Sequence, residues 1–328
     1  MNLPLQHRTI AVNGIHMHVV EQGAGPLVLL CHGFPETWYS WRHQIAPLAR
    51  AGFRVVAPDL RGFGRTDAPQ DTAAYGIFHL VGDLVDLVVK LGEEQAIIVG
   101  HDWGATLAWH AALLRPDMFP AVASLGIPFR QRGSQAPIKA FLSAGLETFY
   151  WVYFQTPGVA EAEFERDIPS TLRRLYYAAS GDAPAEHRLK LVMARGSGFL
   201  DGVPEPEPMP AWLTNADLAT ISEEFSRTGF GPGLNWYRNV DANWEQTEPW
   251  HGARVLVPAL FICGTQEPVI HSAIGKSALL DLPRTVPNLV EQIFLEGAGH
   301  WIQEERPTAV NDALISFLNR CKRRSAPA

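Results

Sequence analysis

The sequence has few cysteines and no long apolar run, and each shortage excludes a class of protein. Its three cysteines, Cys31, Cys263 and Cys321, are too few and too scattered among 328 residues for a disulfide framework. No apolar run reaches the roughly 18 residues that a membrane-spanning helix requires, and the N-terminal M-N-L-P-L-Q-H-R lacks the apolar core of a secretory signal. We therefore expect a soluble, cytoplasmic protein, and we expect Cys31 and Cys263, which lie in apolar runs, to be buried, unreactive thiols.

Positive charge is also scarce. The chain has 27 Lys and Arg against 34 Asp and Glu, a formal net charge of −7, and no basic cluster interrupts the region expected to fold. This balance argues against a nucleic-acid surface, and we expect the basic stretch at residues 320–324 to be a solvated tail. No histidine and cysteine spacing resembles a zinc site, so we expect neither a metal nor a cofactor. The 47% hydrophobic content is ample for a large core.

Apolar runs of strand length alternate with segments of helical periodicity. Near the N-terminus, Asn13-Gly14 separates two short strands and predicts a hairpin. The further expected strands cover residues 26–31, 53–57, 96–100, 121–126, 255–264 and 291–295, and the expected helices cover 37–48, 80–91, 105–114 and 307–318. Continuous apolar strands that alternate with helices predict an α/β fold with a mostly parallel central sheet.

This alternation stops after Pro128. Residues 130–250 are rich in aromatic residues and proline, are mainly helical in pattern and contain no buried strand run. Because strands resume afterwards, we expect one core domain, residues 1–129 and 251–328, interrupted by an inserted helical lid.

The residues that organise the chain lie at 96–104, A-I-I-V-G-H-D-W-G. A strand that leads through Gly100 and Asp102 into Gly104 and a helix fits the nucleophile elbow G-x-Nuc-x-G, with a carboxylate where a serine often stands. A carboxylate is ionised at neutral pH and can attack carbon without a base. Taken alone, the pattern also fits an ordinary strand–helix turn in which Asp102 caps the helix.

Two later residues could complete a hydrolytic site. His300 follows the last expected strand in G-A-G-H-W, and Glu267 is the only carboxylate in the loop after the strand that ends at Gly264. The loop after the preceding expected strand, G-I-P-F at 126–129, has no carboxylate. The order nucleophile, acid, histidine is that of the α/β-hydrolase fold. We therefore expect His300 to be the base and Glu267 to orient it; the alternative is that either residue is a structural or surface group.

With these residues in place, the chain resembles the epoxide hydrolases of the α/β-hydrolase superfamily, of the soluble type, over nearly its whole length. The motifs that carry the resemblance are H-G-F-P-E-T-W-Y-S-W-R at 32–42, P-D-L-R-G-F-G at 58–64, the elbow G-H-D-W-G, Y-F-Q-T-P-G-V-A-E-A-E at 153–163, L-N-W-Y-R-N at 234–239 and G-H-W-I-Q-E-E-R-P at 299–307. The lid motifs discriminate best, because dehalogenases and esterases share the core motifs.

The resemblance implies that two lid tyrosines face the nucleophile. It places them at Tyr237 and Tyr150, with Tyr153 as the near competitor for the second position. Their hydroxyls would donate to the oxygen of the epoxide ring. Relatives usually carry Asp where this chain has Glu267, whose extra methylene requires the backbone or His300 to adjust.

The same resemblance implies that Asp102 forms a covalent ester with the substrate and that water activated by His300 hydrolyses it. The backbone N–H groups of Phe34 and Trp103 would stabilise the oxyanion, and Pro35 would suit a cis peptide. We expect a small apolar epoxide and water as the only partners, in a monomer or a homodimer. The side chains expected to bind the substrate are Phe34, Trp38 and Trp103, and further aromatic candidates are Phe129, Phe149, Trp151 and Phe154.

Three other functions compete with this interpretation. A haloalkane dehalogenase also uses an Asp nucleophile, but usually has Asn where Phe34 stands here and needs N–H donors for its halide. A serine esterase is excluded, because the elbow has no serine. A ligand-binding relative without activity would be expected to lose His300 or the tyrosines, and the chain retains both.

Overall fold

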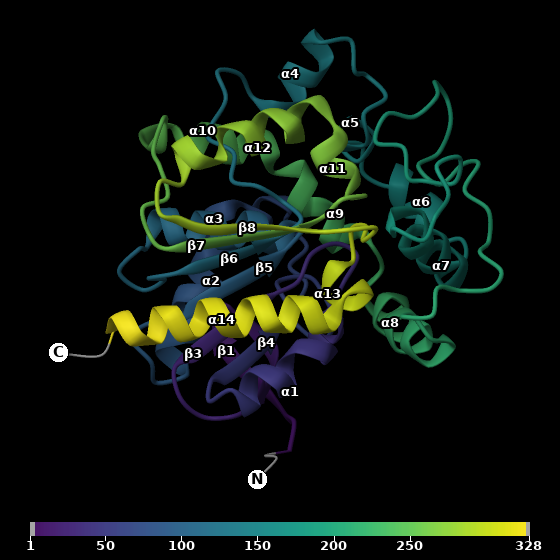
Figure 1. The fold of residues 1–328 in the computed structure, drawn as a ribbon. Coiled ribbons are helices and arrows are strands. Elements are labelled where there is room, and N and C mark those ends of the chain that lie inside the picture. Colours follow the sequence, from purple (N-terminus) through teal and green to yellow (C-terminus); the bar gives the residue numbers. More distant parts are fainter. Residues whose placement is uncertain (1–3, 326–328) are drawn as a thin grey trace.

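The computed structural model describes residues 4–325, with side chains through residue 323. Its centre is an eight-stranded sheet in the order β1-β2-β4-β3-β5-β6-β7-β8 (Figure 1). The strands are β1 (Gln6–Val12), β2 (Ile15–Gln22), β3 (Leu27–Cys31), β4 (Arg54–Pro58), β5 (Ile97–His101), β6 (Val122–Leu125), β7 (Ala259–Gly264) and β8 (Leu289–Leu295). From β4 to β8 the neighbouring strands are parallel, which confirms the predicted fold class.

The N-terminal hairpin adds two antiparallel strands to this sheet. Val12 of β1 pairs with Ile15 of β2, and the two residues between them have positive φ, 42° at Asn13 and 80° at Gly14. Asn and Gly adopt that conformation most readily, and a turn of this hand matches the twist of the strands. The dipeptide therefore predicted the hairpin correctly.

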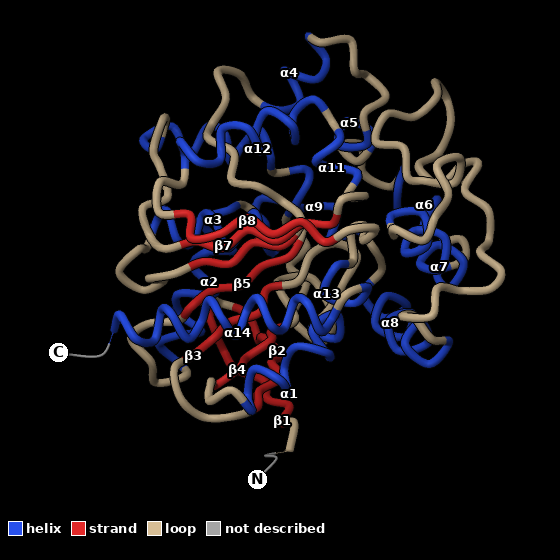
Figure 2. Tube along the Cα trace, in the orientation of Figure 1, coloured by secondary structure: helices blue, strands red, loops and turns tan. Residues whose placement is uncertain are grey.

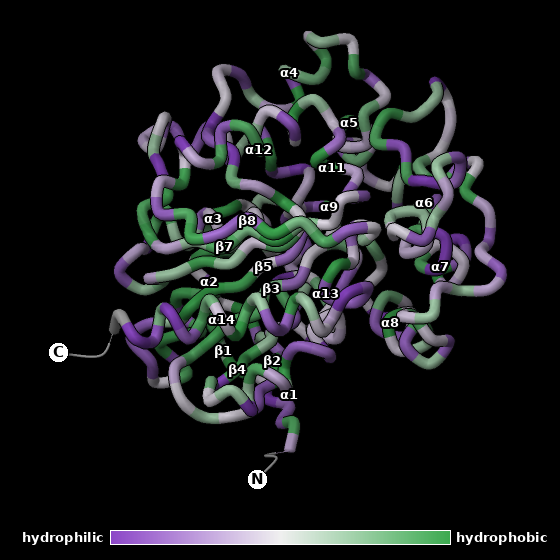
Figure 3. The backbone as a smooth tube through the Cα atoms, viewed as in Figure 1, coloured by the Kyte–Doolittle hydropathy of each residue, from purple (hydrophilic) through white to green (hydrophobic). Residues whose placement is uncertain are grey.

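Helices cover both faces of the sheet (Figures 1 and 2). On one face, buried residues of α1 (Arg42–Arg50) and α14 (Pro307–Ser325) pack on alternate side chains of the strands, and the short helix η1 (Trp38–Trp41) precedes α1. On the other face lie α2 (Ile77–Lys90), α3 (Trp103–Leu114) and α12 (Ala273–Thr285), with the short helix η2 (Thr72–Tyr75) before α2. Because both faces are covered, the inner strands β3 and β5 are buried along their whole length, and Figure 3 shows the inner strands as largely hydrophobic.

One strand is shorter than predicted. Residues 255–258 were expected to begin a strand, but β7 begins at Ala259. Pro258 has no N–H to donate to a neighbouring strand, and only its carbonyl is used, by the N–H of Val122. Proline therefore sets the start of the strand.

The chain between β6 and β7 is mainly helical, as predicted. It contains α4 (Pro137–Ser143), α5 (Tyr150–Tyr153), α6 (Val159–Phe164), α7 (Ile168–Ala179), α8 (Asn215–Thr228), α9 (Gly231–Arg238), α10 (Val240–Gln246) and η3 (Glu248–Trp250). Residues 180–214 differ from this prediction, because they form no helix or named strand. Four prolines and three glycines between residues 196 and 210 account for the difference, since both residue types interrupt helices.

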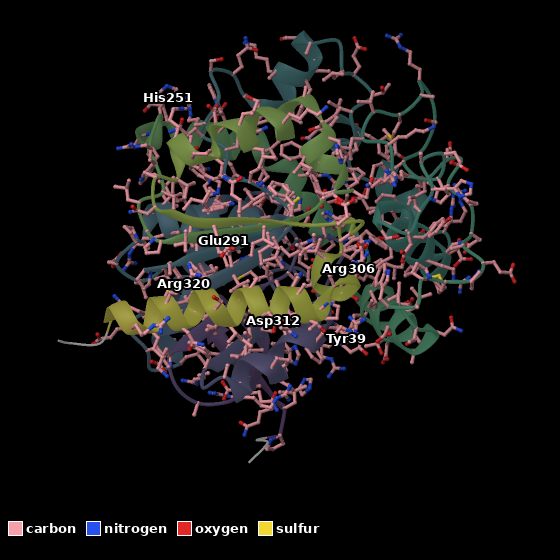
Figure 4. The ribbon with its side chains drawn as sticks, in the orientation of Figure 1. Tyr39, His251, Glu291, Arg306, Asp312 and Arg320 are labelled. Carbon is pink, nitrogen blue, oxygen red and sulfur yellow. The ribbon has the colours of Figure 1, made fainter. Side chains whose placement is uncertain are left out.

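This helical segment is tied to the core by polar contacts. Tyr39, labelled in Figure 4, donates its hydroxyl hydrogen to Asp217 of α8 at 2.8 Å. Arg42 of α1 forms ion pairs with the same Asp217 at 3.1 Å and with Glu304 of α13 (Ile302–Glu305) at 2.6 Å. Both partners of Arg42 are largely shielded from water, so these contacts hold α8 against the core.

The predicted character of the cysteines is confirmed. Cys31, Cys263 and Cys321 are all buried and form no disulfide with one another, and burial raises the pKa of the Cys31 and Cys263 thiols. Among the described residues, no helix is both long enough and apolar enough to cross a membrane.

Candidate active site

The turn between β5 and α3 holds Asp102 in an unusual backbone conformation. Its φ is 51° and its ψ is −118°, and apart from Asn13 it is the only described residue other than glycine with positive φ. Glycines on either side make the turn possible: a Cβ at Gly100 would lie 2.0 Å from the carbonyl oxygen of Gly104, and a Cβ at Gly104 would lie 2.0 Å from that of Cys31. Conformations of this kind are expensive and cluster at functional sites.

Backbone N–H groups hold the Asp102 carboxylate. Its Oδ1 accepts a hydrogen bond from the N–H of Phe34 at 2.9 Å, and the N–H of Trp103 donates to the same carboxylate. Burial raises the pKa of Asp102, and nearby His300 and His101 and these two hydrogen bonds oppose that rise. The structure thus brings both predicted backbone donors to one carboxylate; the peptide bond between Phe34 and Pro35 is cis.

His300 lies between two carboxylates. Its Nδ1 is 2.7 Å from Oε2 of Glu267, and its Nε2 is 3.7 Å from Oδ2 of Asp102. The first distance is a hydrogen bond and the second is longer than one. Burial lowers the pKa of His300, but Glu267, through its charge and its hydrogen bond, and Asp102 outweigh it and raise the pKa to about 9.

Glu267 is fully buried at the start of α11 (Pro268–His271). Burial acts to raise the pKa of Glu267, yet the charge and hydrogen bond of His300, together with the N–H of Val269 at 3.0 Å from Oε1, lower it. The longer side chain is accommodated beside Gly126, where an added Cβ would lie 3.2 Å from Oε2 of Glu267. The sequence showed only that the loop at Gly126 has no carboxylate; it did not show that the loop leaves space for one.

The two lid tyrosines face the same space. Tyr150, the first residue of α5, and Tyr237 of α9 have ring centroids 5.9 Å apart, and both line a cavity together with Asp102. Burial, followed by the charge of Asp102, raises the pKa of both phenols. Tyr153 does not line this cavity; its hydroxyl donates to Glu163 at 2.7 Å. The structure therefore favours Tyr150 over Tyr153 as the partner of Tyr237.

The cavity between these groups has a volume of about 50 Å³. Besides Asp102, His300, Glu267 and the two tyrosines, its wall contains Phe34, Pro35, Phe154, Leu175, Ala179, Leu189, Leu191, Phe199, Pro268, Val269 and Trp301. The wall is therefore apolar except at the candidate reacting groups, as in sites for apolar small molecules.

Several aromatic residues predicted at the cavity lie elsewhere. Trp38 packs its ring against His7 and Tyr39, and the Trp103 ring stacks on Trp151 and packs against Tyr237 outside the cavity wall. Of the five predicted candidates Trp38, Phe129, Phe149, Trp151 and Phe154, only Phe154 lines the cavity, and Phe34 does so as predicted. The rings of Trp38 and Trp103 thus lie outside the wall of this cavity, because packing turns them elsewhere, and their contact with a substrate stays a prediction.

A second buried ion pair, which the sequence interpretation missed, lies behind His300. His101 contacts Oε2 of Glu36 through Nδ1 at 2.9 Å and the carbonyl oxygen of His300 through Nε2 at 2.8 Å. Burial acts to lower the pKa of His101, but the charge and hydrogen bond of Glu36 outweigh this and raise it. The only sequence signal was the position of both residues within the elbow and H-G-F-P-E motifs.

No group of three or more His, Cys, Asp or Glu side chains suited to a metal ion occurs within residues 4–323. The arrangement can instead combine a carboxylate nucleophile, a histidine base with its acid and two phenol donors.

The sequence is similar to a known protein family and to several known enzymes. Residues 26–307 match the family described as "alpha/beta hydrolase fold". The chain is 43% identical over 314 residues to epoxide hydrolase A of Mycobacterium tuberculosis, covering 95% of this chain and 96% of that protein. It is 40% identical to epoxide hydrolase 2 of Siraitia grosvenorii, covering 96% and 99% of the two chains.

Solved structures that resemble this chain are also epoxide hydrolases. An epoxide hydrolase from an endophytic Streptomyces superposes with a TM-score of 0.92 at 47% identity, covering 97% of this chain and 96% of that one. Epoxide hydrolase A from Mycobacterium thermoresistibile superposes with a TM-score of 0.90 at 45% identity, covering 96% and 98%.

Proposed function

The chain belongs to the α/β-hydrolase family and, within it, to the epoxide hydrolases, and we propose that it converts a small apolar epoxide and water into a vicinal diol. One observation carries the proposal: a single apolar cavity is lined by Asp102, His300, Glu267, Tyr150 and Tyr237. A carboxylate nucleophile, a base and two O–H donors around one space are the groups that opening and hydrolysing an epoxide require.

In the first step, Asp102 attacks a ring carbon. Its Oδ1 accepts the hydrogen bond from Phe34, so Oδ2 is the attacking atom. The carbon–oxygen bond of the ring breaks as the ester bond forms, and Tyr150 and Tyr237 donate to the leaving oxygen, which takes up a proton. Donors fixed where the negative charge develops lower the barrier without reorganisation.

In the second step, His300 removes a proton from water, which attacks the ester carbonyl. In the resting site two carboxylates raise the pKa of His300. Esterification removes the charge of Asp102, so this pKa falls, and the proton that His300 releases can replace the one donated by the tyrosines. The neutral imidazole then acts as base, while the N–H groups of Phe34 and Trp103 hold the oxyanion. Collapse of this intermediate breaks the ester carbon–oxygen bond, and the departing diol oxygen takes up the remaining proton of the attacking water, which leaves the Asp102 carboxylate and a protonated His300.

Residues 130–250 act as a lid over this chemistry, and residues 1–129 and 251–328 form the core. The division is supported by the position of both tyrosines on helices between β6 and β7, whereas Asp102, Glu267 and His300 follow core strands. A lid of this kind excludes water except where the reaction needs it.

A single-turnover reaction in ¹⁸O-labelled water tests the proposal. With excess enzyme and styrene oxide as the probe, the label is expected in Asp102 after one turnover, because water attacks the ester carbonyl. His300→Gln is expected to accumulate protein with the mass of one added epoxide. Label found only in the diol, or no adduct in His300→Gln, would contradict the ester route, and halide release from a haloalkane without diol formation would favour a dehalogenase.

A further inference from the structure

The C-terminal end of α7 is in direct backbone contact with the loop that carries His300. The N–H of His300 donates to the carbonyl oxygen of Ala179 at 2.8 Å. The two segments approach so closely that a Cβ at Gly299 would lie 2.3 Å from the backbone nitrogen of Gly181. Figure 2 shows α7 beyond the end of the sheet, on the side where α13 begins. The backbone of the candidate base is therefore held by the lid as well as by the core.

A buried carboxylate reinforces this junction. Oε2 of Glu305 accepts hydrogen bonds from the N–H groups of Gly181 at 3.0 Å and Gly299 at 2.9 Å, and Oε1 accepts one from Trp301 at 3.0 Å. One side chain thus joins Gly181, the second residue after α7, to the residues on both sides of His300. Charge-assisted hydrogen bonds of this kind are stronger than neutral ones.

Tyr176 of α7 makes the most extensive contact with the catalytic loops. Its ring stacks on Trp301, with centroids 4.2 Å apart and an angle of 9° between the planes, and Nε1 of Trp301 donates to its carbonyl oxygen at 2.8 Å. Its hydroxyl donates to the carbonyl oxygen of Pro35 at 3.1 Å. Tyr176 and Trp301 are each only 1% exposed, so water does not compete for these contacts.

Tyr176 therefore joins two loops that have one proposed step in common. The Pro35 loop carries the N–H of Phe34, and Trp301 directly follows His300. Resting on the function proposed above, hydrolysis of the ester uses that N–H to hold the oxyanion and His300 as the base. In the attack on the epoxide the same N–H only holds Oδ1 of Asp102, and His300 is not the base. A residue that fixes these two loops relative to one another should act mainly on hydrolysis.

We propose that Tyr176 is a positioning residue for the hydrolysis half-reaction: through Trp301 and Pro35 it sets His300 and the Phe34 N–H at the distance that attack by water requires. Misplacement of reacting groups by about 1 Å can cost roughly 100-fold in rate, so the stack and the hydroxyl bond are both expected to matter. Tyr176 does not itself line the cavity and reaches the site only through Pro35 and Trp301, so the attack step should depend on it less than hydrolysis does.

The test measures the two half-reactions separately in Tyr176→Phe and Tyr176→Leu. Rapid mixing with styrene oxide, followed by acid quench and intact-protein mass measurement, gives the rates of formation and loss of the ester. Tyr176→Phe keeps the stack and loses only the hydroxyl bond; we expect ester loss to slow about fivefold, the effect of one hydrogen bond. Tyr176→Leu removes both, and we expect about a 50-fold slowing. Ester formation should stay within about twofold of wild type.

Tyr177→Phe is the matched control. Tyr177 is the next residue of the same helix, and its hydroxyl lies 3.3 Å from Nδ1 of His187, away from both catalytic loops. Both of its half-reaction rates should match wild type. The inference would be overturned if Tyr177→Phe slowed ester loss as much as Tyr176→Phe does. It would also be overturned if Tyr176→Phe slowed ester formation and ester loss equally.

The outcomes remain distinguishable if a variant is unstable or if the proposed function is wrong. Should Tyr176→Leu not fold, as judged by circular dichroism, Tyr176→Phe decides, and an ester-loss rate within twofold of wild type overturns the inference. If the wild-type protein forms neither ester nor diol, the proposed function itself is contradicted. If the wild-type protein forms both, and the Tyr176 variants have the same two rates as wild type, only the role of Tyr176 is contradicted.

Discussion

Glu267 stands where the family resemblance implies an Asp, and the surrounding structure fits it closely. Its carboxylate is buried, accepts one hydrogen bond from Val269 and one from His300, and lies beside the open face of Gly126. A charged group without water gains its stability from such fixed donors. The extra methylene is thus matched by space at the end of the neighbouring strand.

Replacing Glu267 by Asp should therefore slow the enzyme, although the family resemblance implies an Asp at this position. The shorter side chain would draw its carboxylate away from Nδ1 of His300, which now lies 2.7 Å from it. We expect ester hydrolysis to fall at least about tenfold, with ester formation little changed. Glu267→Gln keeps the length of the side chain and removes its charge, so it separates the effect of length from the effect of charge. Equal rates of ester hydrolysis in Glu267→Asp and wild type would show that the length of this side chain does not matter.

At the scale of the element, helix α5 separates two tyrosines that the sequence alone left in competition. The helix is one turn long, with Tyr150 at its first position and Tyr153 at its last. The N–H of Tyr150 donates to the carbonyl oxygen of Leu191 at 2.9 Å, which fixes the start of the helix. From there Tyr150 points into the cavity and Tyr153 points to Glu163.

This difference predicts opposite outcomes for two matched variants. Tyr150→Phe should slow ester formation at least about tenfold, because the leaving oxygen loses one of its two donors. Tyr153→Phe removes a hydroxyl that bonds Glu163 outside the cavity and should leave the rate within about twofold. Stopped-flow measurement of ester formation compares the two. Greater damage from Tyr153→Phe than from Tyr150→Phe would reverse the assignment.

At the scale of the whole molecule, three candidate groups from distant parts of the sequence meet at one edge of the sheet. Asp102 follows β5, Glu267 follows β7 and His300 follows β8, and the carboxyl ends of parallel strands lie along one edge. The helices between β6 and β7 cover that edge and supply the tyrosines. As a result, His300 lies between the carboxylates of Asp102 and Glu267 in the folded chain, and this ion cluster contributes to the free energy of unfolding.

The stability of the protein should therefore depend on pH through His300. Its pKa is raised to about 9 in the folded chain, above the roughly 6.5 of an exposed histidine. The folded state binds this proton more tightly, so the stabilisation is complete below about pH 6.5 and is lost as the pH rises through about 9. As the pH rises from about 6.5 to about 9, the Tm of the wild-type protein should fall further than the Tm of His300→Gln, and the difference between the two falls should be about 2 °C or more. Differential scanning calorimetry checks this; parallel curves for the two proteins would contradict it.

The sequence by itself determined the features that depend on neighbours along the chain. Asn13-Gly14 predicted the hairpin, the apolar runs predicted the parallel sheet, and the order Asp102, Glu267, His300 predicted groups that the structure brings together. These predictions succeeded because turn conformation, burial and strand direction follow from local composition and spacing.

Only the tertiary structure decided which side chains share a space. It placed Leu189, Leu191 and Phe199 on the cavity wall and Trp38 away from it, and it set Gly126 beside Glu267. These relations join residues far apart in the sequence, and side-chain direction depends on packing between elements. Residue type and periodicity do not contain that information, because they describe a segment and not its neighbours in space.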